Sequence, residues 1–383
     1  MGSQPKNVVV VGGGTGGTLA ANLLSRKLNG SAQVTLIDPS GRHVYQPGFL
    51  YLMLGQLQAQ ALSRPERQLL RSDVRLLVDG AERIDPDART VALASGETLA
   101  YDALVLAAGA RLSTDEIPGF DQGVDHFYSA DAATRLWERL QAFHGGTLVV
   151  GVGGVPFKCP VAPLEALFLV DDYLRRRGLR GKTELHYVTP MPHIFHLEAV
   201  TPMLEELVRD RGVIVHDLFN LDSVNHDERV LVSYEGEEVR YDLAILVPPH
   251  KGSLLAERSG LADRGGWLKT ARTTLEVEAT ERIWALGDAT NLPVSKAGSV
   301  AHAQAPVVAE RVSAALEERE PTGKHQAFGG DTLCFIEVGQ HKATLLRFSY
   351  TKPPSAPRPN RLFHYGKLAF NRLYFPLVPQ GYV

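Results

Sequence analysis

The residues in this chain best suited to chemistry are its two cysteines, Cys159 and Cys334. Cys159 stands in TLVVGVGGVPFKCPVAPLE, residues 147–165, where a buried strand over 148–150 should lead into a glycine turn and then into a helix that starts near Pro163. Backbone N–H groups and the dipole at a helix N-terminus favour a thiolate, so we expect the pKa of Cys159 to lie below about 8.5, the usual thiol value. Two cysteines in a chain without a secretory signal indicate a catalytic or incidental pair rather than a structural disulfide.

A nucleotide-binding turn is predicted at the N-terminal end of the chain. Residues 7–17, NVVVVGGGTGG, read as a β-branched strand followed by Gly12, Gly14 and Gly17 in the spacing G-x-G-x-x-G, and then by a helix. The next strand ends in Asp38, which lies 21 positions after Gly17. This order is typical of a turn whose glycines approach a pyrophosphate and whose acid binds ribose hydroxyls. Asp38 favours an adenosine ribose without a phosphate.

Two later segments extend this predicted site. The strand in YDALVLAAGARL, residues 101–112, ends in small residues, Ala108 and Gly109, that allow close approach of a ligand. This segment resembles the second FAD-contacting segment of flavoproteins with two dinucleotide-binding domains. A further strand in RIWALGDATNLPVSKAG ends in Gly287 and Asp288, and we expect this carboxylate at a helix N-terminus. The segment resembles the one that holds the ribityl and phosphate part of FAD in such flavoproteins.

A second strand-turn-helix unit starts at residue 147, and its fingerprint is degenerate. Gly151 and Gly153 are in place, but Pro156 occupies the third glycine position. A proline there lacks an N–H donor and prevents close packing of the helix on the strand. The strand that follows, TELHYVTP, ends without an acid or an arginine for a ribose. We therefore predict a dinucleotide-binding fold that no longer binds NAD(P)H.

The composition narrows the class of protein. With 383 residues, 44% hydrophobic and 22% charged, the chain is long enough for two or three globular domains. The net charge of -3 gives no electrostatic case for binding nucleic acid. No apolar run approaches the roughly 18 residues that a membrane-spanning helix needs, and the N-terminus has no pattern of a secretory signal.

The expected fold class is α/β, with two Rossmann-like dinucleotide-binding domains and a C-terminal segment of amphipathic, membrane-interface character. We assign residues 1–112 and 250–325 to a discontinuous FAD domain, 113–249 to the degenerate second domain, and 326–383 to the C-terminal segment. The tail from residue 361 mixes arginine and lysine with phenylalanine and tyrosine. Such a tail could lie in a membrane interface or form a helix packed on the FAD domain.

Across almost the whole chain the motifs resemble those of the sulfide:quinone oxidoreductases. GGGTGG, YDALVLAAG and ALGDAT are general to FAD proteins of the disulfide reductase superfamily. More specific are HVYQPG, FKCPVAPLE, PHIFHLE, LVPPHKG, NLPVSKAG and GDTLCF. The resemblance implies FAD as cofactor, sulfide as donor and a membrane quinone as acceptor, and we assign no metal ligands.

The same resemblance implies roles for individual residues. The redox cysteines of the family fall on Cys159 and Cys334, which would meet at one face of the flavin, take up sulfide as a persulfide and pass two electrons to the flavin. Glu165 and His196 match positions proposed for proton handling, and Lys296 matches one near the pyrimidine end of the flavin. Some members carry a third cysteine before the second Rossmann strand, and this chain has none there.

Two other functions stay open at this point. One is a related flavoprotein with another donor or acceptor, such as an NADH:quinone oxidoreductase or a flavocytochrome c type sulfide dehydrogenase. The other is a redox sensor that uses the flavin fold without turnover. We expect a peripheral membrane protein, cytoplasmic by default, and leave open whether it forms a homo-oligomer.

Overall fold

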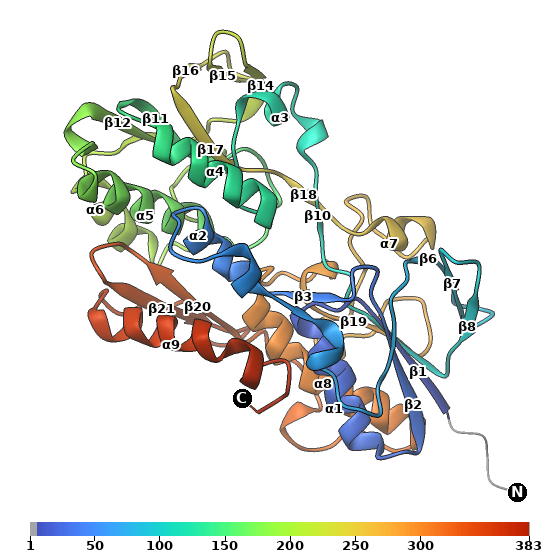
Figure 1. Cartoon of the computed structure of the whole chain (residues 1–383). Helices are drawn as coiled ribbons and strands as arrows, with labels where there is room; N and C mark the ends of the chain where they lie inside the picture. Colours follow the sequence, from blue (N-terminus) through green and yellow to red (C-terminus); the bar gives the residue numbers. More distant parts are fainter. Residues whose placement is uncertain (1–5, 383) are drawn as a thin grey trace, which may run out of the picture.

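The computed structural model describes residues 6–382. The expectation of a chain without a secretory signal rests in part on residues 1–5, which lie outside the described residues. The architecture is α/β, with two parallel sheets in two lobes and a C-terminal unit packed against both (Figure 1).

The first lobe is built on a parallel five-stranded sheet with the order β19-β9-β1-β2-β5. Its strands are β1 (Lys6–Val11), β2 (Ala32–Ile37), β5 (Arg75–Leu77), β9 (Ala103–Leu106) and β19 (Ile283–Ala285). The central strands are apolar on both faces because helices cover one face and further chain covers the other. Helices α1 (Thr15–Leu28) and α8 (Gly298–Leu316) pack against each other on one face. An antiparallel sheet, β6 (Ala81–Asp85), β7 (Thr90–Leu93) and β8 (Thr98–Ala100), adjoins this lobe.

The second lobe contains a parallel four-stranded sheet with the order β13-β12-β11-β17. Its strands are β11 (Gly146–Val152), β12 (Thr183–Val188), β13 (Ile214–His216) and β17 (Leu243–Val247). Its helices are α4 (Ala130–Ala142), α5 (Ala162–Arg176) and α6 (Thr201–Arg209). Helix α5 starts one residue before Pro163, as predicted, and its buried face fills the core of the lobe. The antiparallel strands β14 (Leu221–Asn225), β15 (Val230–Ser233) and β16 (Glu238–Arg240) form its outer edge.

The C-terminal unit consists of an antiparallel pair and one long helix. Strands β20 (Thr332–Glu337) and β21 (Ala343–Phe348) precede α9 (Arg361–Leu377), which lies along them (Figure 1). The Pro-rich stretch at 351–360 connects β21 to α9 as predicted. Strand β20 contacts both α5 of the second lobe and α8 of the first. The C-terminal unit therefore joins the two lobes.

The remaining elements are short. They are β3 (Arg42–Val44), α2 (Phe49–Leu52), β4 (Ser63–Pro65), β10 (Arg111–Leu112), α3 (Phe120–Gly123), β18 (His250–Lys251) and α7 (Leu254–Arg258). The loop that feeds α2 is the segment HVYQPG, which contains a 3-10 turn at Gln46–Gly48.

One local expectation is wrong. Asp288 does not stand at the N-terminus of an α-helix, because Gly287–Ala289 form a single 3-10 turn and α8 starts only at Gly298. The loop between the turn and α8 carries Lys296 instead.

Candidate active site

The first glycine turn is shaped by close packing of backbone on backbone. β1 ends at Val11 and α1 begins at Thr15. Gly12 has φ +106°, and a Cβ atom there would lie 2.4 Å from the carbonyl oxygen of Ala107. A Cβ atom at Gly17 would lie 1.8 Å from the carbonyl oxygen of Gly12, whereas one at Gly14 would meet no heavy atom within 4 Å. Gly12 and Gly17 are thus required by the fold itself, and Gly14 borders open space.

Two helix N-termini meet at this turn. Neither α1 nor α8 has a side-chain cap or an acidic residue in its first turn. A Cβ atom at Gly298, the first residue of α8, would lie 3.7 Å from Oγ1 of Thr15. The backbone N–H groups at helix N-termini favour negatively charged groups. The pair of uncapped ends therefore suits a pyrophosphate.

The predicted cofactor residues surround the same edge of the first sheet. Oδ2 of Asp38 accepts a hydrogen bond from the backbone N–H of Gly13 at 2.8 Å. Ala108 and Gly109 directly follow the end of β9, and Gly287 and Asp288 follow the end of β19. Ligands bind at the carboxyl ends of such parallel strands, where the strand order reverses. These residues fit FAD.

Lys296 lies in a partly enclosed position beside this edge. Its Nζ donates a hydrogen bond to the carbonyl oxygen of Thr290 at 2.6 Å and lies 3.7 Å from the centre of the Trp267 ring. Burial lowers the pKa of Lys296 to about 8. A negatively charged ligand at this edge would therefore favour the charged form of Lys296.

The two cysteines approach the same short segment, residues 296–299. The backbone N–H of Cys159 donates to the carbonyl oxygen of Lys296 at 2.8 Å. Sγ of Cys334, on β20, lies 3.8 Å from Oγ of Ser299. Both thiols are free and half-buried against one hydrophobic cluster. Two cysteines that are far apart in the sequence thus both contact the segment that enters α8.

The expected low pKa of Cys159 is wrong for the protein without bound cofactor. Burial raises the pKa of the Cys159 thiol, and the charges of Glu165 and Cys334 raise it further. Burial also raises the pKa of Cys334 to about 11, against a hydrogen bond with Ser299 that lowers it. Cys159 lies three residues before α5 in a left-handed conformation with φ +54°. Removal from water outweighs the helix dipole, whose effect falls off within the first turn.

A buried ion pair lies close enough to both thiols to influence their ionisation. Oε1 of Glu165, on α5, accepts hydrogen bonds from Nζ of Lys367 on α9 and, at 2.8 Å, from the backbone N–H of Glu337. Glu165 is 2% exposed and Lys367 is 6% exposed. The positive charge of Lys367 lowers the pKa of both cysteines, while Glu165 raises it. The structure therefore brings Glu165 to the cysteine pair, through a lysine that the sequence had not singled out.

A second carboxylate continues this network toward the surface. Glu337, at the end of β20, is 1% exposed. Nδ1 of His364 lies 3.0 Å from its Oε2, and the hydroxyl of Tyr51 donates to its Oε1 at 3.2 Å. The charges of Glu165 and Glu337 together raise the pKa of Lys367, so its ammonium form is held between two carboxylates.

Another buried network connects α9 to the glycine turn. Nε2 of His43 lies 2.8 Å from the hydroxyl of Tyr374, which lies 2.6 Å from Oγ1 of Thr15. On its other side, Nδ1 of His43 lies 3.0 Å from Oγ1 of Thr18, which donates to Oε1 of Glu66. All these side chains except Thr15 are buried. The HVYQPG segment thus links the C-terminal helix to the first turn of α1.

His196 lies apart from these networks. It is exposed on the loop between β12 and α6, where its ring packs on Phe195. The buried Glu165 and Lys367 have partners in α9 and β20 instead. The structure does not bring His196 into contact with that pair.

The second glycine turn differs from the first in its length. Three residues separate β1 from α1, but nine residues, 153–161, separate β11 from α5. Pro156 and Cys159 lie in this longer connection. The N-terminus of α5 therefore does not follow the glycines directly, as it does in the first turn.

Sequence reasoning missed the residues on the inner face of α9. His364, Lys367, Asn371 and Tyr374 are spaced three, four and three apart, the spacing of one helix face. The opposite face is apolar, with Leu362, Tyr365, Phe370 and Leu373 exposed by 77%, 58%, 40% and 49%. The spacing of these polar residues can be recognised in the sequence. However, the rule that the polar face of an amphipathic helix points to solvent would have placed them outward.

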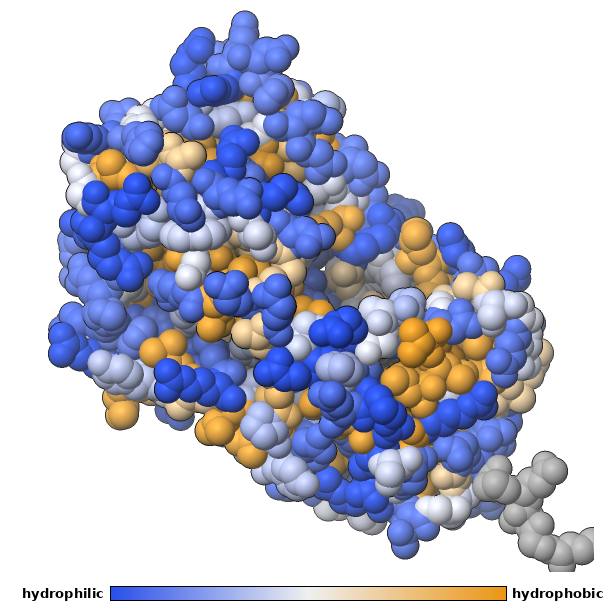
Figure 2. Space-filling view, viewed as in Figure 1, coloured by the Kyte–Doolittle hydropathy of each residue, from blue (hydrophilic) through white to orange (hydrophobic). Residues whose placement is uncertain are grey.

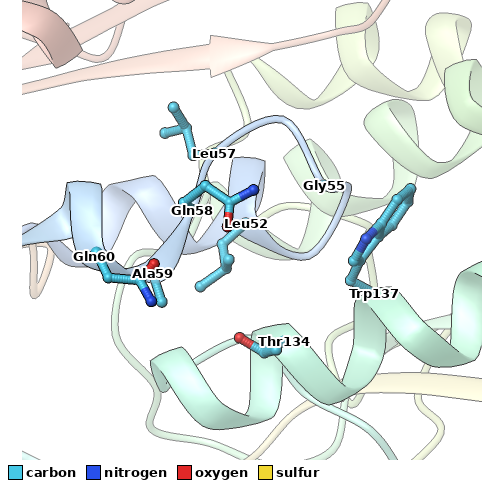
Figure 3. Close-up of a pocket in the computed structure, with 8 residues that line it drawn as sticks. All are labelled: Leu52, Gly55, Leu57, Gln58, Ala59, Gln60, Thr134 and Trp137. Carbon is cyan, nitrogen blue, oxygen red and sulfur yellow. The ribbon is translucent and has the colours of Figure 1, made fainter.

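A cavity of about 230 Å³ lies between α4 and the chain that follows α2 (Figure 3). Trp137 and Thr134 line it from α4, and Leu52 and Gln58 line it from the other side. Neither cysteine borders this cavity. Among residues 6–382, no group of three or more His, Cys, Asp or Glu side chains is placed to hold a metal ion. No helix in that range is long and apolar enough to cross a membrane.

Comparison with known proteins agrees with this geometry. Residues 6–307 match the model of the pyridine nucleotide-disulphide oxidoreductase family. The mitochondrial sulfide:quinone oxidoreductase of Mus musculus is 28% identical over 358 residues, which cover 91% of this chain and 79% of the mouse protein. The crystal structure of the sulfide:quinone oxidoreductase from Aquifex aeolicus superposes with a TM-score of 0.87 at 22% identity, covering 98% of this chain and 92% of that one. An alternative NAD(P)H-ubiquinone oxidoreductase of Arabidopsis thaliana is 28% identical but covers 74% of this chain.

The chain therefore belongs to the pyridine nucleotide-disulphide oxidoreductase family. Within that family it is an FAD-dependent oxidoreductase of the sulfide:quinone oxidoreductase type.

Proposed function

We propose that the protein oxidises sulfide to sulfane sulfur at Cys159 and Cys334 and that the electrons pass through FAD to a membrane quinone. The observation that carries the proposal is the approach of both cysteines to residues 296–299. This loop leads from Lys296 to the uncapped N-terminus of α8. The sulfur chemistry and the proposed cofactor site therefore share one structural element.

The sulfur step needs both cysteines. In the oxidised state they form a disulfide or a sulfur-bridged pair. Hydrosulfide attacks one sulfur, the bond between the cysteines breaks, and the products are a persulfide on one cysteine and a thiolate on the other. Lys367 and the Ser299 hydroxyl both favour the thiolate form, the first by its charge and the second by a hydrogen bond to Cys334.

The cofactor would be held by the residues at the edge of the first sheet. FAD, when bound, supplies a two-electron carrier between sulfur donor and quinone. Gly14 and the N-termini of α1 and α8 would bind its pyrophosphate, Asp38 its ribose, and Asp288 and Lys296 the remainder. We assign FAD binding to residues 1–112 and 250–325, one redox cysteine to the degenerate second domain at 113–249, and the other redox cysteine with the quinone-facing part to 326–383.

The outer face of α9 is the proposed membrane contact. Leu362, Tyr365, Phe370 and Leu373 are exposed there beside Arg361 and Arg372. Figure 2 shows hydrophobic side chains at the surface along the edge where α9 lies in Figure 1. Apolar side chains flanked by arginines are typical of helices that lie in a lipid interface. A quinone dissolved in the bilayer would then reach the protein beside α9.

Binding to liposomes tests this contact. Flotation with vesicles of phosphatidylcholine and phosphatidylglycerol should carry the protein upward, and the double substitution Leu362→Ser, Leu373→Ser should reduce the bound fraction. Tyr234→Ser serves as the control, because Tyr234 is 74% exposed on the other lobe. Equal binding of both variants would remove α9 as the contact.

Anaerobic titration of the FAD-loaded protein tests the function. Sulfide should bleach the flavin absorbance, and a short-chain ubiquinone analogue should restore it. Cys334→Ser and Cys159→Ser should keep FAD but lose the reduction by sulfide. Bleaching of these variants at the rate of the unsubstituted protein would exclude the cysteine mechanism.

NADH is the alternative donor, and the second glycine turn argues against it. The nine residues between β11 and α5 separate the helix N-terminus from the glycines that would hold a pyrophosphate. We therefore expect NADH to reduce the flavin far more slowly than sulfide does. Comparable rates with the two donors would favour an NADH:quinone oxidoreductase, and no reduction by either would favour a redox sensor.

A further inference from the structure

We propose that Lys367, Glu337 and His364 form a path through which Glu165 exchanges a proton with solvent during turnover. The inference rests on the proposed oxidation of sulfide by quinone. It assigns a role to three residues that lie beyond the cysteines and the cofactor edge.

The sulfur half of the reaction requires a path by which a proton leaves the cysteines. Oxidation of hydrosulfide to sulfane sulfur releases two electrons and one proton, whereas reduction of a quinone to a quinol takes up two electrons and two protons. The sum is HS⁻ + quinone + H⁺ → S⁰ + quinol. The proton released by the sulfur half-reaction appears at the half-buried cysteines beside Glu165, which is 2% exposed, so it must leave this site before the next turnover.

Glu165 is the inner end of the path. Its Oε1 is occupied by Nζ of Lys367 and the backbone N–H of Glu337, and the residue is 2% exposed. Before the transfer, the negative charge beside Lys367 is the Glu165 carboxylate. After a thiol of Cys159 or Cys334 gives its proton to Glu165, the negative charge is the thiolate, so the number of charges near Lys367 does not change. Lys367 therefore stabilises both states of the transfer, and the buried site never holds an additional unpaired charge.

Glu337 and His364 form the outer end. Oε2 of Glu337 lies 3.0 Å from Nδ1 of His364, and the two charges of Glu337 and Lys367 interact. His364 is the member nearest the surface, 9% exposed on α9, and its ring packs at 5.4 Å against that of the exposed His341. A histidine can accept a proton on one ring nitrogen and release one from the other.

The charged and titratable groups around the path come from several elements. Tyr51 on α2 donates to Glu337, Glu165 faces the path from α5, and His341 and Tyr365 lie beside His364. The placement of a histidine at the outer end, with a carboxylate behind it, is the arrangement of a proton relay.

Chemical rescue tests the relay in the FAD-loaded full-length protein. His364→Ala should slow sulfide-to-quinone turnover by about tenfold or more, since positioned proton transfer contributes about 10²–10⁴ in rate. Added imidazole should restore the rate in proportion to its concentration, and turnover in D₂O should be slowed more than for the unsubstituted protein. His341→Ala, a neighbouring histidine outside the path, should keep the original rate.

A second variant guards against a folding defect. Glu337→Gln keeps the shape of the side chain but cannot carry the proton, and should lose a similar fraction of turnover while thermal melting and flavin absorbance confirm the fold. Unchanged turnover in both folded variants, or a loss that responds neither to imidazole nor to D₂O, would overturn the relay. If the unsubstituted protein is not reduced by sulfide at all, it is the proposed function that fails.

Discussion

The hydroxyl of Tyr374 lies 2.8 Å from Nε2 of His43, so the C-terminal helix is bonded to the segment that follows the first two strands. The same hydroxyl lies 2.6 Å from Oγ1 of Thr15, in the first turn of α1. Helix α9 thereby touches the place where the pyrophosphate is proposed to bind. A change in α9 can reach the cofactor through one side chain.

Tyr374→Phe should weaken this link. The substitution leaves His43, which is fully buried, without a partner at Nε2, and a lost buried hydrogen bond costs about 1–3 kcal/mol. We expect a lower thermal midpoint and faster loss of FAD on dilution, measured by flavin fluorescence. Tyr365→Phe is the matched control, because Tyr365 lies on the same helix and is 58% exposed. Identical FAD retention in the two variants would show that the link does not support the cofactor.

Substitutions at Gly14 and Gly17 in the first turn should have different effects, one on FAD binding and the other on folding. Gly17→Ala places a Cβ atom 1.8 Å from the carbonyl oxygen of Gly12, so the turn must open and the variant should be unstable even without FAD. Gly14→Ala meets no atom of the protein within 4 Å, so it should fold normally but bind FAD more weakly if the pyrophosphate lies there. Thermal melting with and without FAD measures both effects. Unaltered FAD affinity in Gly14→Ala would move the pyrophosphate away from this turn.

Local patterns allowed much of the fold to be predicted. The spacing of Gly12, Gly14 and Gly17 predicts the first turn because the strand, the turn and the helix are adjacent in the sequence, and Gly17 packs directly on the backbone of Gly12. The approach of Cys159 and Cys334 to one loop could not be derived in this way, since it depends on the packing of β20 between α5 and α8. The resemblance to a family, not the spacing, suggested that pair.

Burial explains why the sequence-based prediction for the Cys159 thiol was wrong. The helix N-terminus near Cys159 predicted a thiolate, but sequence alone does not show how much water a thiol loses, and desolvation determines the direction. Helix α9 shows the reverse case. Because lysine and histidine are polar, Lys367 and His364 would be expected to face solvent. Their inward position is favourable only because carboxylates on other elements, Glu165 and Glu337, contact them.

Thiol labelling should report the electrostatic balance at the cysteines. Because burial raises the pKa of Cys334 to about 11, iodoacetamide should react slowly at neutral pH in the FAD-free protein and about tenfold faster per pH unit upward. Glu165→Gln should accelerate labelling, since the carboxylate raises the pKa of both thiols. Lys367→Met should retard it for the opposite reason. Mass spectrometry of tryptic peptides assigns the rate to each cysteine, and equal rates in both variants would contradict this balance.

Glu310 should make the stability of the first lobe sensitive to acid. Its carboxylate, on α8, accepts hydrogen bonds from Lys27 and Arg319, each at 2.7 Å. Burial opposes ionisation, but these hydrogen bonds lower the pKa of Glu310 from 4.5 to about 2. The folded state therefore prefers the charged carboxylate more than the unfolded state does, so the stabilisation is present above pH 4.5 and is lost as the pH falls toward 2.

Glu310→Gln should lower the thermal midpoint at pH 7 and flatten its decline between pH 5 and about 2.5. Glu281→Gln removes a carboxylate that is 84% exposed and should leave both the midpoint and its decline unchanged. A parallel decline in the Glu310 variant and the unsubstituted protein would assign the acid sensitivity to other carboxylates.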